Sequence, residues 1–250
     1  MNKNSHEQDP EKGMRSDDGE NGAHSVAHTR RPSRIANPAP AGLFSFASTT
    51  FLLSMYNVNT RGIHTPNVVI GMAIFCGGLV QLLAGMWEFP RGNVHGATAF
   101  ASYGAFWMSY ATILIPGSGT LNAYANNQAE FHNALGMYLI VWFMVSTMLV
   151  YVSAPPLFSV RASAFNDQNI PLYSIPVVRR NLALTLLLGC LGLTYLLLGI
   201  GEFNGKASVT KAGGAFGIIT ALIAYYIGVS EMLAVEESAI VKLPLGIWSR

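Results

Sequence analysis

Six long apolar stretches, separated by short polar segments, constrain the fold of this chain more than any other feature. A transmembrane helix needs about 20 consecutive, mainly apolar residues, and such stretches lie near residues 41–57, 68–88, 96–115, 131–152, 181–200 and 211–234. Charged residues make up only 11% of the chain, against about 25% in soluble domains. Residues 41–160 contain four of them, Arg61, Glu88, Arg91 and Glu130. The sequence therefore predicts an all-α, polytopic membrane protein with six helices that cross the lipid bilayer.

The two ends of the chain differ from this apolar middle. Residues 1–36 are rich in Asp, Glu, Asn, Gly, Ser and His and contain almost no large apolar side chains, so they cannot bury enough surface to fold. We expect a disordered cytoplasmic tail there, without the apolar segment of a signal peptide. A six-span transmembrane domain over residues 37–235 and a short cytoplasmic tail over residues 236–250 complete the predicted organisation.

The distribution of Lys and Arg predicts the orientation of the chain in the membrane, because cytoplasmic loops carry an excess of these residues. Given six spans, nine basic residues near the spans fall on one side, namely Arg30, Arg31, Arg34, Arg91, Arg161, Arg179, Arg180, Lys242 and Arg250. Three fall on the other side, Arg61, Lys206 and Lys211. We therefore expect both termini in the cytoplasm and a multi-pass protein of the plasma membrane.

Two segments of the chain resemble each other. The run from Leu82 to Phe89 aligns with the run from Leu196 to Phe203, and the start of the first span, around Gly42, aligns with that of the fourth, around Gly136. An odd number of spans between the copies would invert one copy relative to the other in the membrane. Inverted repeats are typical of transporters, with the substrate site near the midplane. The alternative is chance similarity between Leu- and Gly-rich helices.

Polar side chains lie inside several of the apolar stretches. Thr98, Ser102, Ser109 and Thr112 fall on one face of a helix over residues 96–115, and such a face either bonds a neighbouring helix or lines a wet path. Gln81 lies within the second span, where its amide needs a partner. Glu88 lies near the end of that span, where it has a functional role or pairs with Arg91.

No arrangement of residues in the sequence indicates an enzyme. The histidines near the spans, His64, His95 and His132, are far apart along the chain, and Cys76 and Cys190 lie in separate apolar stretches. We therefore expect no metal site, no cofactor and no catalytic residue. The net charge of +2 and the lack of basic runs interleaved with aromatic residues give no indication of nucleic-acid binding.

Several motifs resemble those of one family. They are Asn37-Pro-Ala-Pro40-x-Gly42-Leu43, Thr49-Thr-Phe-Leu-Leu-Ser-Met-Tyr-Asn57, Gly77-Gly-Leu-Val-Gln81, Ala84-Gly-Met-Trp-Glu88, Gly92-Asn93, Thr98-Ala-Phe-Ala-Ser-Tyr103-Gly-Ala-Phe-Trp107 and Lys211-Ala-Gly-Gly-x-Phe-Gly217. Over residues 35–235 the chain is similar to the acetate/succinate permease family of bacteria and fungi. That family includes fungal acetate permeases, ammonia-export proteins and the glyoxylate pathway regulator.

The resemblance implies a homo-hexamer of six-span protomers, each with its own pathway for small carboxylates. It places an aromatic and aliphatic constriction at Phe46, Tyr103 and Leu191. It associates carboxylate binding with the motif Asn37, Pro38, Ala39 and Pro40, and it places Thr49, Gln81 and Glu88 near the path. Hydroxyl and amide donors of Asn37, Thr49, Thr50 and Tyr103 would replace water around a carboxylate, while Phe46 and Leu191 would accept its methyl end.

Two departures from the family pattern are visible. Ala41 stands where the family usually has Leu after the second proline, and the connection over residues 153–180 is longer than usual. The longer connection affects the register of the fifth span and hence the assignment of Leu191.

Three functions remain open from the sequence. The first is permeation of acetate and related acids such as succinate, propionate and lactate, through a channel or coupled to protons. The second is export of ammonium or ammonia, since aromatic rings suit a cation. The third is a non-transporting signalling protein on the same scaffold.

Overall fold

Each of the six predicted stretches is helical in the computed structural model, which describes residues 35–153, 180–235 and 243–248. These residues belong to a single unit, Ser33–Arg250. The long helices are α1 (Ala39–Asn57), α4 (Val94–Leu114), α6 (Gln128–Ser153), α7 (Leu182–Asn204) and α8 (Ala207–Leu233). The second stretch consists of α2 (Val69–Ile74), the π-helix η2 (Phe75–Val80) and α3 (Gln81–Glu88) in direct succession.

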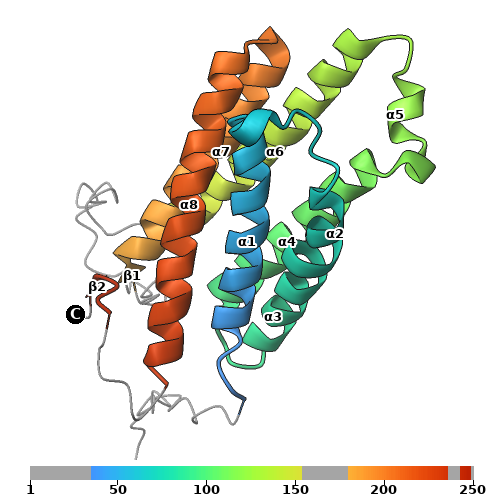
Figure 1. The fold of residues 1–250 in the computed structure, drawn as a ribbon. Helices are drawn as coiled ribbons and strands as arrows, with labels where there is room; N and C mark the ends of the chain where they lie inside the picture. The colour runs from blue at the N-terminus through green and yellow to red at the C-terminus, as the bar shows by residue number, and fades with distance from the viewer. Residues whose placement is uncertain (1–34, 154–179, 236–242, 249–250) are drawn as a thin grey trace, which may run out of the picture. The chain divides into compact units, whose positions relative to one another are not determined.

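Short elements connect these helices. The 3-10 turn η1 (Thr60–Gly62) follows α1, and η3 (Pro116–Ser118) and the four-residue helix α5 (Thr120–Ala123) lie between α4 and α6. Counting α2, η2 and α3 as one stretch, the six helical stretches run in alternating directions (Figure 1). The beginning of α1 and the end of α8 therefore lie at the same end of the helical unit, where the Asn37 side-chain amide donates to Glu231 Oε2 at 2.9 Å.

The sequence explains several helix boundaries. Pro38 is the N-cap residue of α1 and Pro40 lies in its first turn, where proline costs no hydrogen bond. Asn93 caps α4, because its side-chain oxygen accepts from the backbone N–H of Gly96 at 3.1 Å. Gly205, with φ of 60°, makes the tight turn between α7 and α8.

Glycines allow the helices to approach closely. A Cβ atom at Gly214 would lie 2.9 Å from Asn57 Cβ, and one at Gly217 would collide with Ser54 Oγ, so α8 packs directly on α1. On α6, a Cβ atom at Gly136 would lie 2.5 Å from the ring of Phe203 on α7. Small residues at such contacts are the usual means of helix association in membranes.

Within the described residues, four helical segments are long and apolar enough to cross a membrane: Val69–Glu88, Gln128–Ser153, Leu182–Asn204 and Ala207–Leu233. The remaining two long helices, α1 and α4, have 19 and 21 residues, which corresponds to about 28 and 32 Å at about 1.5 Å per residue. Both helices are therefore long enough to span. The six-span count and the inverted repeat stay predictions.

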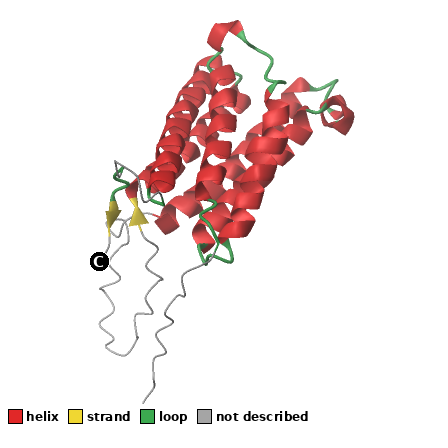
Figure 2. Ribbon diagram, turned by 60° about the horizontal axis from the view of Figure 1, so that its bottom comes forward, coloured by secondary structure: helices red, strands yellow, loops and turns green. Residues whose placement is uncertain are grey.

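A small pairing of strands departs from the all-α prediction. β1 (Arg180–Asn181) and β2 (Ile247–Trp248) are antiparallel and join the segment before α7 to the C-terminal segment (Figure 2). Residues just before β2 also contact the helices, since Tyr226 and Ser230 donate hydrogen bonds to the carbonyls of Pro244 and Leu243. Residues 243–248, which the sequence assigns to a short tail, are therefore attached to α7 and α8. The tail predicted over residues 1–36 lies almost wholly outside the described residues.

Candidate functional site

Two cavities lie between the helices of the described unit. Cavity 1 has a volume of about 120 Å³ and is bordered by α1, α3, α4, α7 and α8. Cavity 2 has a volume of about 60 Å³ and is bordered by α1, α4, α6, α7 and α8. Along α1, α4 and α7 the lining changes from one cavity to the other within about one turn. Phe46 and Thr50 mark this change on α1, Tyr103 and Phe106 on α4, and Leu188 and Leu191 on α7.

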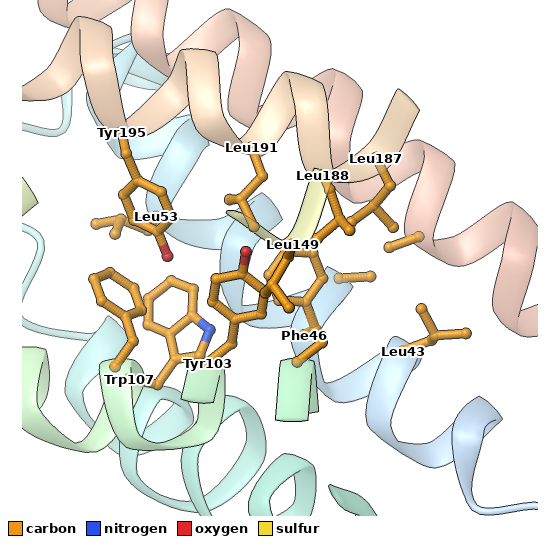
Figure 3. Close-up of a cluster of buried hydrophobic side chains, with 14 of the residues drawn as sticks. Leu43, Phe46, Leu53, Tyr103, Trp107, Leu149, Leu187, Leu188, Leu191 and Tyr195 are labelled. Carbon is orange, nitrogen blue, oxygen red and sulfur yellow. The ribbon is translucent and has the colours of Figure 1, made fainter. Parts of the chain in front are cut away.

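The layer between the cavities, which we call the plug, consists of Phe46, Tyr103 and Leu191. All three are 2–3% exposed, and the ring centroids of Phe46 and Tyr103 are 5.9 Å apart. Figure 3 shows the two rings on one side and Leu191, with Leu188, on the other. The plug therefore fills the space between the two cavities with apolar side chains from three helices.

Tyr103 is held in this layer by its hydroxyl group. Tyr103 Oη lies 2.9 Å from Ser146 Oγ of α6, and Ser146 also donates to the carbonyl of Trp142 at 2.9 Å. Tyr195 of α7 stacks on Tyr103 with centroids 6.5 Å apart. The orientation of the Tyr103 ring thus depends on α6 and α7 as well as on its own helix.

The predicted polar residues of α1 and α3 differ in their surroundings. The Thr49 hydroxyl donates to the carbonyl of Ser45 at 2.9 Å and packs against Gly77 of the π-helix, away from both cavities. Thr50 lines cavity 2 and Gln81 lines cavity 1. Thr50 Oγ1 and Gln81 Oε1 are both buried without a hydrogen-bond partner within the described part of the chain.

A cluster of polar side chains lies at the end of the unit where α1 begins. Glu88 is fully buried, and its carboxylate accepts from Arg91 Nη1 at 3.0 Å and from Asn93 Nδ2 at 2.9 Å. Arg91 also donates to Asn37 Oδ1, and Asn37 donates to Glu231. The pairing of Glu88 with Arg91, one of the two alternatives from the sequence, is therefore present.

The motif that begins with Asn37 builds the start of α1 at this cluster. Asn37 Oδ1 accepts from the backbone N–H of Ala39 at 3.2 Å as well as from Arg91, and Pro38 and Pro40 occupy the cap and first turn. Ala39 lines cavity 1, while Asn37, Pro38 and Pro40 do not. In this structure Asn37 links α1 to the turn between α3 and α4 and to α8, and it lines neither cavity.

The other end of the unit has a second ionisable pair. His132 Nδ1 of α6 lies 2.6 Å from Glu202 Oε2 of α7, and Glu202 lines cavity 2. In the sequence alignment of the two segments, Glu202 corresponds to Glu88. Each cavity thus has a carboxylate at its border, Glu231 for cavity 1 and Glu202 for cavity 2.

One sequence interpretation was only partly supported. The hydroxyls of Thr98 and Thr112 are exposed and donate to carbonyls of their own helix, Val94 and Met108. Ser109 contacts Tyr138 of α6 at 2.7 Å. None of the four hydroxyl residues of this face lines cavity 1 or cavity 2. Helix packing, one of the two alternatives from the sequence, is present at Ser109, and a wet path along this face stays a prediction.

The structure also brings residues to the cavities that sequence reasoning did not select. Trp107 lines cavity 2, and its buried indole Nε1 has no partner among described residues. His95, Leu187 and Leu188 line cavity 1, and Tyr195 lines cavity 2. Spacing could have indicated three of them, because Trp107 follows Tyr103 by four positions and Leu187 and Leu188 precede Leu191 by four and three. Within the described residues, no group of three His, Cys, Asp or Glu side chains could hold a metal ion.

The fold and the site define a multi-pass membrane protein with cavities on either side of an apolar plug. The sequence profile of the GPR1/FUN34/yaaH family matches residues 21–160 and 170–246. The chain belongs to this family.

Relatives and a solved structure show the extent of the similarity. The chain is 40% identical over 203 residues to acetate permease A of Emericella nidulans, covering 77% of this chain and 60% of that protein. It is 39% identical over 214 residues to ammonia transport outward protein 2 of Saccharomyces cerevisiae, covering 86% of this chain and 67% of that protein. The chain thus spans about two thirds of the length of these fungal relatives. The structure of the bacterial acetate channel SatP matches with a TM-score of 0.67 and 30% identity, covering 85% of this chain and all of that one.

Proposed function

We propose that this protein is a membrane permease or channel for small monocarboxylates, chiefly acetate. The observation that carries the proposal is the pair of cavities, of about 120 and 60 Å³, on the two sides of the plug. The plug is defined here by the three residues that the family resemblance assigns to the constriction, and their burial between the two linings supports that assignment. Similarity to an acetate permease and to an acetate channel structure supports the same substrate class.

In this proposal the predicted residues have distinct roles. Phe46, Tyr103 and Leu191 form the narrow point of the path, and their rings and methyl groups set the size limit. Thr50 and Gln81 offer polar atoms to a permeating acid on either side of it. Thr49 fixes the packing of α1 on the π-helix. Asn37, Pro38, Ala39, Pro40 and Glu88 shape the opening of cavity 1.

The lining suits weak and fast binding. Among the described residues, no Lys or Arg lines either cavity, so no cation traps an anion there, and conduction requires binding that is weak enough for release. Moving one negative charge inward against 100 mV requires about 2.3 kcal/mol. Uptake therefore needs a cotransported proton or a steep inward gradient. Succinate, propionate and lactate are further substrates that we propose for the same path.

The proposal includes an arrangement in the membrane. The domain over residues 37–235 has six spans in two inverted halves, with tails over residues 1–36 and 236–250 in the cytoplasm, in a homo-hexamer of the plasma membrane. The lengths of α1 and α4, the contact between Asn37 and Glu231 and the excess of Lys and Arg on one side support this arrangement. Outward-facing apolar residues such as Phe75 and Met148, both 64% exposed, suit contact with lipid or neighbouring protomers.

Flux measurements on the purified full chain in proteoliposomes test the function. Uptake of radiolabelled acetate above that of protein-free vesicles is expected, with no uptake of radiolabelled methylammonium. Methylammonium flux without acetate flux would refute the proposed carboxylate permeation and support ammonium export. The absence of both fluxes in well-assembled protein would favour a non-transporting signalling role.

A further inference from the structure

An ionisable pair lies at the end of the helical unit where α6 begins and α7 ends. His132 Nδ1 lies 2.6 Å from Glu202 Oε2, and the two side chains are 53% and 22% exposed. The two helices pack closely beside the pair, since a Cβ atom at Gly136 would lie 2.5 Å from the ring of Phe203. Glu202 also lines cavity 2. The pair therefore places a side chain that can carry a positive charge against a carboxylate that borders the cavity.

Burial along the lining shows that cavity 2 approaches solvent at this end. The lining residues next to the plug, such as Thr50 and Trp107, are buried. Asn57 at the end of α1, Glu202 in the last turn of α7 and Thr210 in the first turn of α8 line the other end, and all three are partly exposed. We call these three residues the rim. A solute that enters cavity 2 from solvent at this end passes the rim.

The charge at the rim depends on the pair. Within the described residues, Glu202 is the only charged residue that lines cavity 2, and its ion-pair partner is His132. Tyr110 of α4 lines the same end of the cavity. Other ionisable side chains at this end of the unit are exposed, and none of them forms an ion pair with Glu202 in the described part of the chain. They are Arg61 and His64 after α1, Glu130 of α6, and Lys206 and Lys211 at the start of α8.

The pair has two charge states that are compatible with one geometry. An imidazolium donates from both ring nitrogens, and a neutral imidazole with its proton on Nδ1 donates from that atom as well. The hydrogen bond from His132 to Glu202 can therefore persist while the net charge of the pair changes from zero to −1. Histidine is the side chain whose charge changes between about pH 5 and 8. The rim is thus neutral when His132 is protonated and carries an unmatched carboxylate when it is not.

An unmatched carboxylate at the rim opposes the entry of an anion. Leucine and aromatic side chains make up most of the lining between the rim and the plug. In a cleft with walls of low polarity, charges of one sign raise the local concentration of the opposite ion by about 10- to 1,000-fold, and they lower that of a like ion correspondingly. A single carboxylate that is 22% exposed belongs at the lower end of this range. The expected effect on the entry of a small carboxylate is therefore about tenfold.

We propose that His132 is a specificity-determining residue of the path, because its charge decides whether the rim of cavity 2 admits anions. With His132 protonated, a small carboxylate passes a neutral rim. Without that proton, the carboxylate of Glu202 repels it. This inference rests on the proposed function and adds a charge filter at one end of the path. The filter is separate from the plug, which selects by size.

Two charge variants test the filter through the KM of acetate uptake in proteoliposomes, with the flux of protein-free vesicles subtracted. His132→Gln removes the cation and keeps an N–H donor, and it should raise KM about tenfold at pH 5.5 while leaving it near the wild-type value at pH 8. Glu202→Gln removes the carboxylate, and it should match the wild type at pH 5.5 and lower KM about tenfold at pH 8. Comparing proteins at the same pH cancels the effect of pH on the substrate itself.

Further variants separate charge from packing. Adding Glu202→Gln to His132→Gln leaves a neutral rim and should restore the wild-type KM at pH 5.5, whereas damage to packing would persist in the double variant. His132→Arg keeps a cation at every pH, so its KM at pH 8 should equal that of Glu202→Gln. Glu130→Gln is a matched control, because Glu130 is an exposed carboxylate of α6 that bonds Asn127 and lines neither cavity. It should leave KM unchanged at both pH values.

The outcomes separate this inference from the proposed function. Acetate uptake with an unchanged KM in His132→Gln at pH 5.5 would overturn the charge filter and leave acetate permeation intact. A raised KM that the double variant does not restore would also overturn it. If His132→Gln fails to assemble, Glu202→Gln decides the matter, since a KM at pH 8 no lower than that of the wild type contradicts the filter. Absence of acetate uptake by the wild-type protein would instead refute the proposed function.

Discussion

Removing the ring of Phe46 should open the route between the two cavities. Phe46 is 3% exposed and packs against Tyr103, and it is the last residue of α1 that lines cavity 1, one turn before Thr50 of cavity 2. Phe46→Ala deletes a side chain that fills a large part of the plug while Tyr103, held by Ser146, stays in place. The cavities of about 120 and 60 Å³ would then be joined by the space that the ring leaves.

The size of the effect follows from the energy of forcing a larger group through a packed layer. Inserting extra methylene groups into a well-packed core costs about 1–3 kcal/mol. Release of that penalty corresponds to about 5- to 150-fold in rate. The substitution should therefore raise the ratio of lactate to acetate flux, or of succinate to acetate flux, by a factor in this range. It should also lower stability by about 3–5 kcal/mol.

Phe44→Ala is a matched control on the same helix. Phe44 is half-buried, packs against Tyr225 and Gly228 of α8, and lines neither cavity. Uptake of radiolabelled acids in proteoliposomes, normalised to the amount of assembled protein, should show the raised ratio for Phe46→Ala and the wild-type ratio for Phe44→Ala. An unchanged ratio in well-assembled Phe46→Ala would refute the assignment of the plug as the narrow point.

The remaining predictions concern packing, the polar cluster and orientation. Gly217→Ala should lower the unfolding temperature in detergent, because the added methyl group collides with Ser54 and overpacking costs about 1–3 kcal/mol. Gly189→Ala is the control, since the Cβ position of Gly189 has open space around it, and it should leave the unfolding temperature unchanged. Arg91→Ala should destabilise the protein by about 3–5 kcal/mol, since it leaves the buried carboxylate of Glu88 without its cation. A fall in unfolding temperature no larger than that of Gly189→Ala would contradict this prediction. A reporter fused after residue 250 should react only with probes that reach the cytoplasm; labelling from outside intact cells would contradict the proposed orientation.

Apolarity along the chain was sufficient to predict the helices. Each predicted stretch coincides with a helix or helical succession to within a few residues, because 20 apolar residues leave few alternatives in a bilayer. The π-helix at Phe75–Val80 and the pairing of β1 with β2 could not be predicted. Both depend on tertiary contacts: Gly77 meets Thr49 and Trp107 across helices, and β2 lies far from β1 in the sequence.

Two kinds of site residue could be predicted from the sequence: polar residues within an apolar stretch, and residues that the family resemblance named. Gln81 and Thr50 were selected because a polar group inside an apolar stretch needs a reason, and each lines a cavity. The hydroxyl face of α4 satisfied the same rule and yet lies outside the cavities. Short hydroxyl side chains donate to the carbonyl four residues earlier in their own helix, as Thr98 and Thr112 do. Their hydrogen bonds are therefore satisfied without a water-filled path beside the helix. Periodicity shows which residues share a face and not which neighbour that face meets.

The distribution of unpartnered polar atoms gives the two cavities and the plug different roles. Each cavity has two lining residues with a buried polar atom that lacks a hydrogen-bond partner within the described residues, Gln81 and His95 for cavity 1 and Thr50 and Trp107 for cavity 2. The plug has none among the described residues, since the Tyr103 hydroxyl is bonded and its other members are apolar.

A permeating acid would therefore find hydrogen bonds in each cavity and lose them while it crosses the plug. Two binding positions separated by one barrier predict that Thr50→Val, which removes a hydrogen-bonding atom but keeps the shape, changes the concentration dependence of uptake. Phe46→Ala, which lowers the barrier, should instead change the maximal rate. Initial rates of acetate uptake over a range of concentrations measure both. If the two variants altered the same kinetic parameter, the separation of binding positions from barrier would be wrong.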